Sequence, residues 1–120
     1  MTMMNVHGSN PSIDLPLLGT VVDRIVEEVH PRQIILFGSH ARGDARSDSD
    51  IDLLVVSDDV YGLKNSRRAA LGRLYQSLAR LPVPADILLF SRVEVENWTS
   101  SLNHVVGRAM REGKILYERP

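Results

Sequence analysis

The spacing of apolar and polar positions divides the chain into helical and extended segments. Apolar residues recur at helical spacing up to His30-Pro31, and the residue before a proline disfavours the α conformation, so the first helix should end there. Ser12 or Asp14 could cap this helix, and Pro16 falls near its first turn. The apolar face of the helix consists of Leu18, Val21, Val22, Ile25, Val26 and Val29.

Short apolar runs predict strands at residues 34–37, 51–56, 85–90 and 114–117. The second run is almost continuously apolar, as is typical of a strand covered on both faces.

The segments between these strands predict two further helices. One covers residues 65–81, where Pro82 and Pro84 stop it, and the other covers residues 95–111 and ends at Gly113. Residues 41–49 are small, polar and charged, which indicates a loop with about one helical turn, and residues 57–62 turn the chain. Strands that alternate with helices, without a long structureless loop, predict an α/β or α+β domain of three layers.

Length and composition indicate one soluble domain. The chain has 120 residues, of which 43% are hydrophobic and 24% charged, as in ordinary globular proteins. We expect residues 1–12 to form a flexible N-terminal tail and residues 13–120 to form a single domain. A net charge of -1 argues against broad electrostatic binding to nucleic acid or anionic membranes, so no direct nucleic-acid partner is expected.

The chain contains no cysteine, which excludes disulfides and thiolate metal sites and is consistent with a reducing compartment. Its first residues lack the apolar core of a signal peptide, and no apolar run approaches the roughly 20 residues that span a bilayer. We therefore expect a cytoplasmic location without membrane association.

Three acidic residues border the predicted strands. Asp50 and Asp52 open the second strand, and side chains two residues apart on a strand point the same way. Two carboxylates at such a short distance repel each other unless a proton or a cation neutralises them. Asp86 opens the third strand and is placed for the same edge of the sheet. Three converging carboxylates suit Mg²⁺ or Mn²⁺, and two such ions roughly 3.5–4 Å apart can stabilise a phosphoryl displacement.

A Gly-Ser pair precedes these acids and directly follows the first strand. Gly38 lets the backbone approach a phosphate closely and adopt unusual dihedral angles. The Ser39 hydroxyl, the turn N–H groups and Arg42 could then bind phosphate oxygens. Gly43 provides a second flexible point.

Other readings of these residues are weaker. The series Asp48, Asp50, Asp52 resembles the start of a calcium loop, but Leu53 stands where that loop requires glycine, and a strand follows. Asp44 and Asp48 are expected to be solvated turn acids. His7, His30 and His104 are read as surface or structural residues, whereas His40 is an exception because it lies beside Ser39. Trp98 is read as a packing residue, and the arginines of residues 65–81 as a solvated face that a partner could use.

The stretch from Phe37-Gly-Ser-His-Ala-Arg-Gly to Ser49-Asp-Ile-Asp-Leu-Leu-Val resembles the minimal nucleotidyltransferase family of the DNA polymerase β superfamily. A looser similarity covers about three quarters of the chain, from residue 33 through residue 118. The resemblance implies a nucleotidyltransferase fold, with a short mixed sheet flanked by helices. It also implies transfer of a nucleoside monophosphate, most simply AMP from ATP, with pyrophosphate as the leaving group.

The resemblance assigns roles to the motif residues. Gly38 and Ser39 would bind the triphosphate, while Asp50 and Asp52 would ligate two Mg²⁺ ions. Asp86 would join the catalytic metal and help to deprotonate the acceptor hydroxyl. The resemblance assigns no role to His40.

The resemblance also implies a partner. Larger family members carry an added acceptor-binding domain that this chain lacks, so another molecule, or an oligomer, would complete the site. Family members of this size are similar to antitoxins encoded beside a HEPN-domain ribonuclease toxin, which they silence by adenylylating a tyrosine. Two alternatives remain open: an antitoxin that acts by binding alone, and a transferase for a small molecule such as an aminoglycoside. The preferred base, the number of AMP units and the oligomeric state are also open.

Overall fold

A computed structural model describes residues 15–46, 48–62, 66–98 and 104–120. The predicted tail at residues 1–12, which includes His7 and the candidate cap Ser12, lies outside the described residues. The other candidate cap, Asp14, also lies outside them. The helices are α1 (Leu15–Val29), α2 (Ser39–Arg42), α3 (Arg67–Leu78), α4 (Arg92–Trp98) and α5 (Val105–Glu112). The strands are β1 (Gln33–Phe37), β2 (Ile51–Ser57), β3 (Ala85–Ser91) and β4 (Lys114–Glu118).

The strands form one mixed sheet in the order β3-β2-β1-β4. β1 pairs antiparallel with both β2 and β4, whereas β2 and β3 are parallel. This register places Asp52 of β2 beside Asp86 of β3 and, on its other side, beside Phe37 of β1. The predicted mixed sheet with flanking helices is therefore confirmed.

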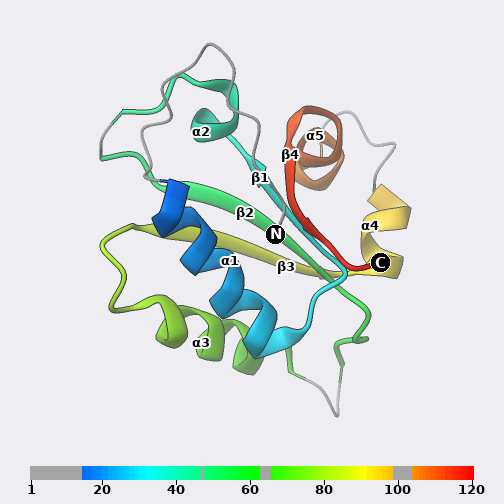
Figure 1. Cartoon of the computed structure of the whole chain (residues 1–120). Helices are drawn as coiled ribbons and strands as arrows, with labels where there is room; N and C mark the ends of the chain where they lie inside the picture. Colours follow the sequence, from blue (N-terminus) through cyan, green and yellow to red (C-terminus); the bar gives the residue numbers. More distant parts are fainter. Residues whose placement is uncertain (1–14, 47, 63–65, 99–103) are drawn as a thin grey trace.

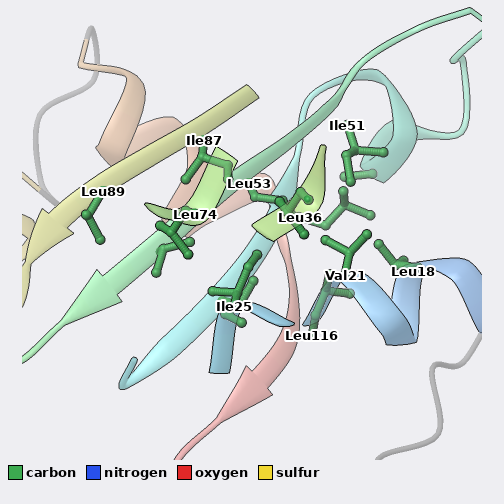
Figure 2. Packing of buried hydrophobic residues seen from close by; sticks show 14 of the residues in the cluster. Leu18, Val21, Ile25, Leu36, Ile51, Leu53, Leu74, Ile87, Leu89 and Leu116 are labelled. Carbon is green, nitrogen blue, oxygen red and sulfur yellow. The ribbon is translucent and has the colours of Figure 1, made fainter. Parts of the chain in front are cut away.

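Helices cover both faces of the sheet (Figure 1). The face toward α1 and α3 carries the larger apolar cluster, part of which Figure 2 shows. The face toward α4 and α5 carries a smaller one, which includes Val95 of α4 and Val106 of α5. The result is the predicted three-layer arrangement.

Alternation along β2 decides which side each residue faces. Ile51, Leu53 and Val55 pack in the cluster under α1 and α3, whereas Leu54 and Val56 pack under α4 and α5. Asp52 lies two residues before Leu54 and therefore projects on the α4/α5 side. All the other residues of β2 are buried, as the apolar run predicts for a strand covered on both faces.

The prediction of one continuous helix over residues 95–111 is wrong. His104 has an extended backbone (φ -87°, ψ 138°), and its Nδ1 accepts a hydrogen bond from the Val106 N–H at 3.1 Å, which makes it the N-cap of α5. Its ring also stacks on Trp98, with the centroids 4.4 Å apart. His104 and Trp98 are thus packing residues, as predicted, and His104 also caps the start of α5.

The expectation of a solvated arginine face on residues 65–81 fails for Arg67. Its guanidinium lies over the rings of Tyr61 and Phe90 and donates to Glu94 of α4. Arg67 therefore joins the start of α3 to α4. Arg73, in contrast, lies more than half exposed beside Glu28 of α1, at 3.6 Å.

None of the helices in the described ranges has the length and apolarity to cross a bilayer.

Candidate functional site

The turn from β1 into α2 requires glycine at its first position. Gly38 has φ 75° and ψ -155°, which side chains disfavour. A Cβ atom built on Gly38 would also collide with the carboxylate of Asp52. The backbone at Gly38 therefore lies directly against Asp52, and this contact fixes the distance between the Gly-Ser turn and the acidic strand.

α2 is a single helical turn that presents Ser39 and Arg42 above the sheet edge. It begins at Ser39, two residues before the predicted loop, and ends at Arg42. The next residue, Gly43, has φ 85° and donates its N–H to the Ser39 carbonyl at 3.0 Å. Gly43 is thus the C-cap of α2, in the left-handed conformation that glycine adopts readily. The Arg42 Nε lies 3.3 Å from the Asp44 Oδ2, and both side chains are at least half exposed.

The three candidate acids stand at the starts of β2 and β3. Asp52 is half-buried within β2, Asp50 is exposed just before this strand, and Asp86 is exposed in β3. Burial raises the pKa of Asp52 above its usual value, and the charges of Asp86 and Asp50 raise it further. His40 and Arg42 partly oppose this rise. The acids therefore repel one another across the sheet edge.

The acids at this edge could supply a divalent metal with one or two of its ligands. Within the described ranges, no group of three or more His, Asp or Glu side chains is placed to hold a metal ion by itself. Mg²⁺ keeps several waters and binds through one or two carboxylates together with substrate phosphates, so an open set is what it requires. The repulsion at Asp52 is the kind that a bound cation relieves.

A cavity of about 290 Å³ opens beside Asp52. One wall is formed by β1, the Gly-Ser turn and α2, and the opposite wall is formed by α5. The lining residues are Phe37, Gly38, Ser39, Arg42, Asp52, Val105, Arg108, Ala109 and Glu112. Asp86 is not part of this lining, so the cavity lies on the β1 side of Asp52 and Asp86 lies on the other. Ligand pockets typically begin at about this size.

His40 fixes the loop that leads into β2. Its side chain is buried, and Nε2 lies 3.0 Å from the carbonyl oxygen of Ser49, the residue before Asp50. Because a carbonyl only accepts, Nε2 carries the hydrogen. The sequence left the role of His40 open; in the structure its side chain is buried and anchors the loop at Ser49, one residue before Asp50 and two before the start of β2. Asp48, in the same loop, is exposed.

Sequence reasoning missed the α5 wall of the cavity. Val105, Arg108, Ala109 and Glu112 share one face of α5, as their i, i+3, i+4 and i+7 spacing requires. That spacing is visible in the sequence. What the sequence does not show is that this face lies opposite the Gly-Ser turn.

Known proteins resemble this chain in sequence. The profile of the nucleotidyltransferase domain family matches residues 18–116. Over 86 residues, the chain is 33% identical to a protein of Methanocaldococcus jannaschii whose name gives protein adenylyltransferase as a proposed activity. The alignment covers 72% of this chain and 78% of that protein.

Two solved structures also resemble the chain. A crystal structure of a proposed nucleotidyltransferase from Sulfolobus solfataricus has a TM-score of 0.48 and 20% identity, and covers 95% of this chain and 94% of its own. A toxin–antitoxin structure with AMP-PNP has a TM-score of 0.49 and 22% identity, and covers 82% of this chain and 72% of its own.

Proposed function

Because the chain belongs to the nucleotidyltransferase family, we propose that it transfers AMP from ATP to a tyrosine hydroxyl of a partner protein. The partner in this proposal is a HEPN-domain ribonuclease toxin, which the modification silences. The observation that carries the proposal is the contact of Gly38 with Asp52, which brings the Gly-Ser turn and the acidic strand together beside one cavity.

The position of the cavity supports a nucleotide on one side of Asp52. Gly38, Ser39 and Arg42 line it, and their N–H, hydroxyl and guanidinium groups suit phosphate oxygens. Asp86 lies one strand away on the opposite side of Asp52, a separation of about 4.8 Å between neighbouring strands. The acceptor hydroxyl would therefore approach across β3.

In the proposed reaction, the acceptor oxygen forms a bond to the α-phosphorus of ATP. The bond from that phosphorus to the oxygen bridging the β-phosphorus breaks, and pyrophosphate leaves. Asp86 accepts the hydroxyl proton. Two Mg²⁺ ions, held by Asp50, Asp52 and Asp86, would neutralise charge on the attacking and leaving oxygens.

A protein acceptor is favoured by two observations. Asp86 is exposed, so a side chain on a folded partner could reach it. The Methanocaldococcus relative carries protein adenylyltransfer as its proposed activity and shares 33% identity with this chain.

The proposal is tested with ATP labelled on its α-phosphate. Incubation with Mg²⁺ and the protein encoded by the neighbouring gene should label that protein, and mass spectrometry should place the adenylyl group on tyrosine. Asp52→Asn should reduce labelling at least about a hundredfold, because a carboxylate beside the reacting phosphate is lost. Asp59→Asn is the matched control, since Asp59 is an exposed acid beyond the opposite end of β2.

Equal labelling by wild type and Asp52→Asn would refute catalysis at this site. If the double variant Asp50→Asn, Asp52→Asn still neutralised the toxin at full strength, binding alone would account for its effect. Label found on a small hydroxylated molecule, such as an aminoglycoside, and absent from the protein would identify a different acceptor class.

A further inference from the structure

We propose that Arg108 of α5 is a nucleotide-binding residue that holds the triphosphate from the wall opposite Ser39 and Arg42. This inference rests on the proposed function and deepens it, because it adds a binding residue that lies outside the Gly-Ser and Asp-x-Asp motifs. Arg108 lines the same cavity as Gly38, Ser39, Arg42 and Asp52.

The sheet holds α5 firmly in this position. Val106 and Ala109, on its inner face, are 0% and 1% exposed in the cluster under α4 and α5. At the end of the helix, a Cβ atom on Gly113 would collide with the Ile35 side chain and lie 2.9 Å from the Leu36 carbonyl oxygen. The α5 wall is therefore packed directly against β1, the strand that leads into the Gly-Ser turn, and Arg108 is carried on a fixed support.

The guanidinium of Arg108 is free to turn from Glu112 and donate hydrogen bonds to a phosphate. Its Nε lies 4.0 Å from the Glu112 Oε2, which is too long for a hydrogen bond, and the two side chains are 61% and 51% exposed. Exposed pairs of this kind contribute little stability, so exchanging Glu112 for phosphate has a small cost. The planar fork of arginine matches two phosphate oxygens at once.

Glu112, which also lines the cavity, should weaken triphosphate binding, whereas Arg108 should strengthen it. The lining contains two arginines, Arg42 and Arg108, and two acids, Asp52 and Glu112. The metal would neutralise Asp52 in the loaded site, whereas Glu112 belongs to α5 and is not one of the candidate metal ligands. Glu112 should therefore repel the triphosphate and compete with it for Arg108.

The test measures binding of α,β-methylene-ATP, which cannot undergo adenylyl transfer, by calorimetry with Mg²⁺. Arg108→Ala should raise the Kd about tenfold, since a charge-assisted contact is lost, and Arg108→Lys should fall between it and wild type. Glu112→Gln should lower the Kd about twofold to threefold. Arg111→Ala is the matched control and should leave the Kd unchanged, because Arg111 is exposed on the same helix but does not line the cavity.

AMP separates triphosphate binding from binding of the rest of the nucleotide. With AMP as the competing ligand, Arg108→Ala and wild type should differ by less than about twofold, because the β- and γ-phosphates are missing. An equal loss with AMP and with the triphosphate would overturn the assignment of Arg108 to the triphosphate.

The outcomes distinguish this inference from the proposed function. If wild type and Arg108→Ala bind the triphosphate analogue equally while wild type still labels its partner, the inference alone falls. If wild type binds no nucleotide, both fall. Should Arg108→Ala fail to fold, Glu112→Gln provides the opposite prediction, and an unchanged or raised Kd would overturn the inference.

Discussion

At the scale of single residues, Asp52 is an acid in a place that disfavours its negative charge. It is half-buried, with Gly38 against its carboxylate and with Asp86 as its register partner. Burial and the neighbouring acids make its ionised form costly. A purely structural position would favour a neutral residue here. An ionised acid is favoured only if a cation or a polar ligand compensates for it.

Asp52→Asn should therefore raise the Tm of the metal-free protein by a few degrees at neutral pH. The pKa of Asp52 is higher in the folded state than the ordinary value of 3.8. Below pH 3.8 Asp52 is protonated in both the folded and the unfolded state, and the protein has its full stability. As the pH rises through the folded-state pKa, the carboxylate ionises and this stability is lost. The increase in Tm caused by Asn should therefore vanish below pH 3.8. Thermal melting in EDTA across this pH range measures it.

Two controls support the interpretation of this experiment. Asp59→Asn removes an exposed acid and should leave the Tm nearly unchanged. Addition of Mg²⁺ with a non-cleavable ATP analogue should stabilise wild type more than Asp52→Asn. A lower Tm for Asp52→Asn in EDTA would contradict the view that this acid is held at a cost.

At the scale of elements, α4 begins with a reciprocal hydrogen-bond pair. The Ser91 Oγ accepts from the Glu94 N–H at 3.1 Å, and the Glu94 Oε1 accepts from the Ser91 N–H at 2.9 Å. This is a capping box, and it explains why α4 starts at Arg92 and not at residue 95 as predicted. Glu94 also accepts from Arg67, so one carboxylate joins β3, α4 and the start of α3.

Glu94→Ala should lower the stability at neutral pH by about 1–2 kcal/mol, since the cap and the Arg67 contact are both lost. Burial raises the pKa of Glu94, but the hydrogen bonds from Ser91 and the contacts with Arg67 outweigh it, so the pKa lies below its usual value of 4.5. The stabilisation is therefore present above pH 4.5 and is lost as the pH falls through the lowered pKa. Urea unfolding at several pH values tests this.

Glu96→Ala is the matched control for Glu94→Ala. Glu96 is exposed on the same helix and should change the stability by less than about 0.5 kcal/mol at any pH. A destabilisation of Glu94→Ala that persisted unchanged in acid would show that the carboxylate charge has no part in it.

At the scale of the whole molecule, one face of the sheet carries the larger apolar cluster and the candidate site lies apart from it. The larger cluster, under α1 and α3, supplies much of the buried core (Figures 1 and 2). The cavity is instead lined by β1, α2, β2 and α5, and no residue of α1 or α3 takes part. Stability and the candidate chemistry are therefore separable by mutation.

Leu74→Ala should cost about 2–4 kcal/mol, because Leu74 of α3 is 0% exposed at the centre of the larger cluster. Partner labelling with ATP, assayed well below the lowered Tm, should remain within about twofold of wild type, since the cavity keeps all its lining residues. Leu71→Ala, on the same helix but only half-buried, should cost less. A large loss of labelling by folded Leu74→Ala would contradict the separation.

The sequence by itself determined the local elements and the chemistry of the motifs. Apolar spacing places α1, β2, β3 and the centre of α3 because those signals are local and strongly periodic. Gly38 and Gly43 stand out in the sequence as glycines of the motif, and both have the positive φ that glycine adopts most readily. The break at His104 was missed because a capping histidine stacked on Trp98 has no simple periodic signature.

Only the tertiary structure decided the pairing of strands and the helix that closes the cavity. The sequence predicted that Asp86 shares a sheet edge with Asp52, but sheet order makes the two direct register partners, and packing of α5 on β1 brings Arg108 and Glu112 to the cavity beside the Gly-Ser turn. No local rule encodes these contacts, since they follow from how two helix layers close over one sheet. A sequence pattern can indicate that a side chain is charged and exposed on a helix, but the packed fold decides which cavity that side chain lines.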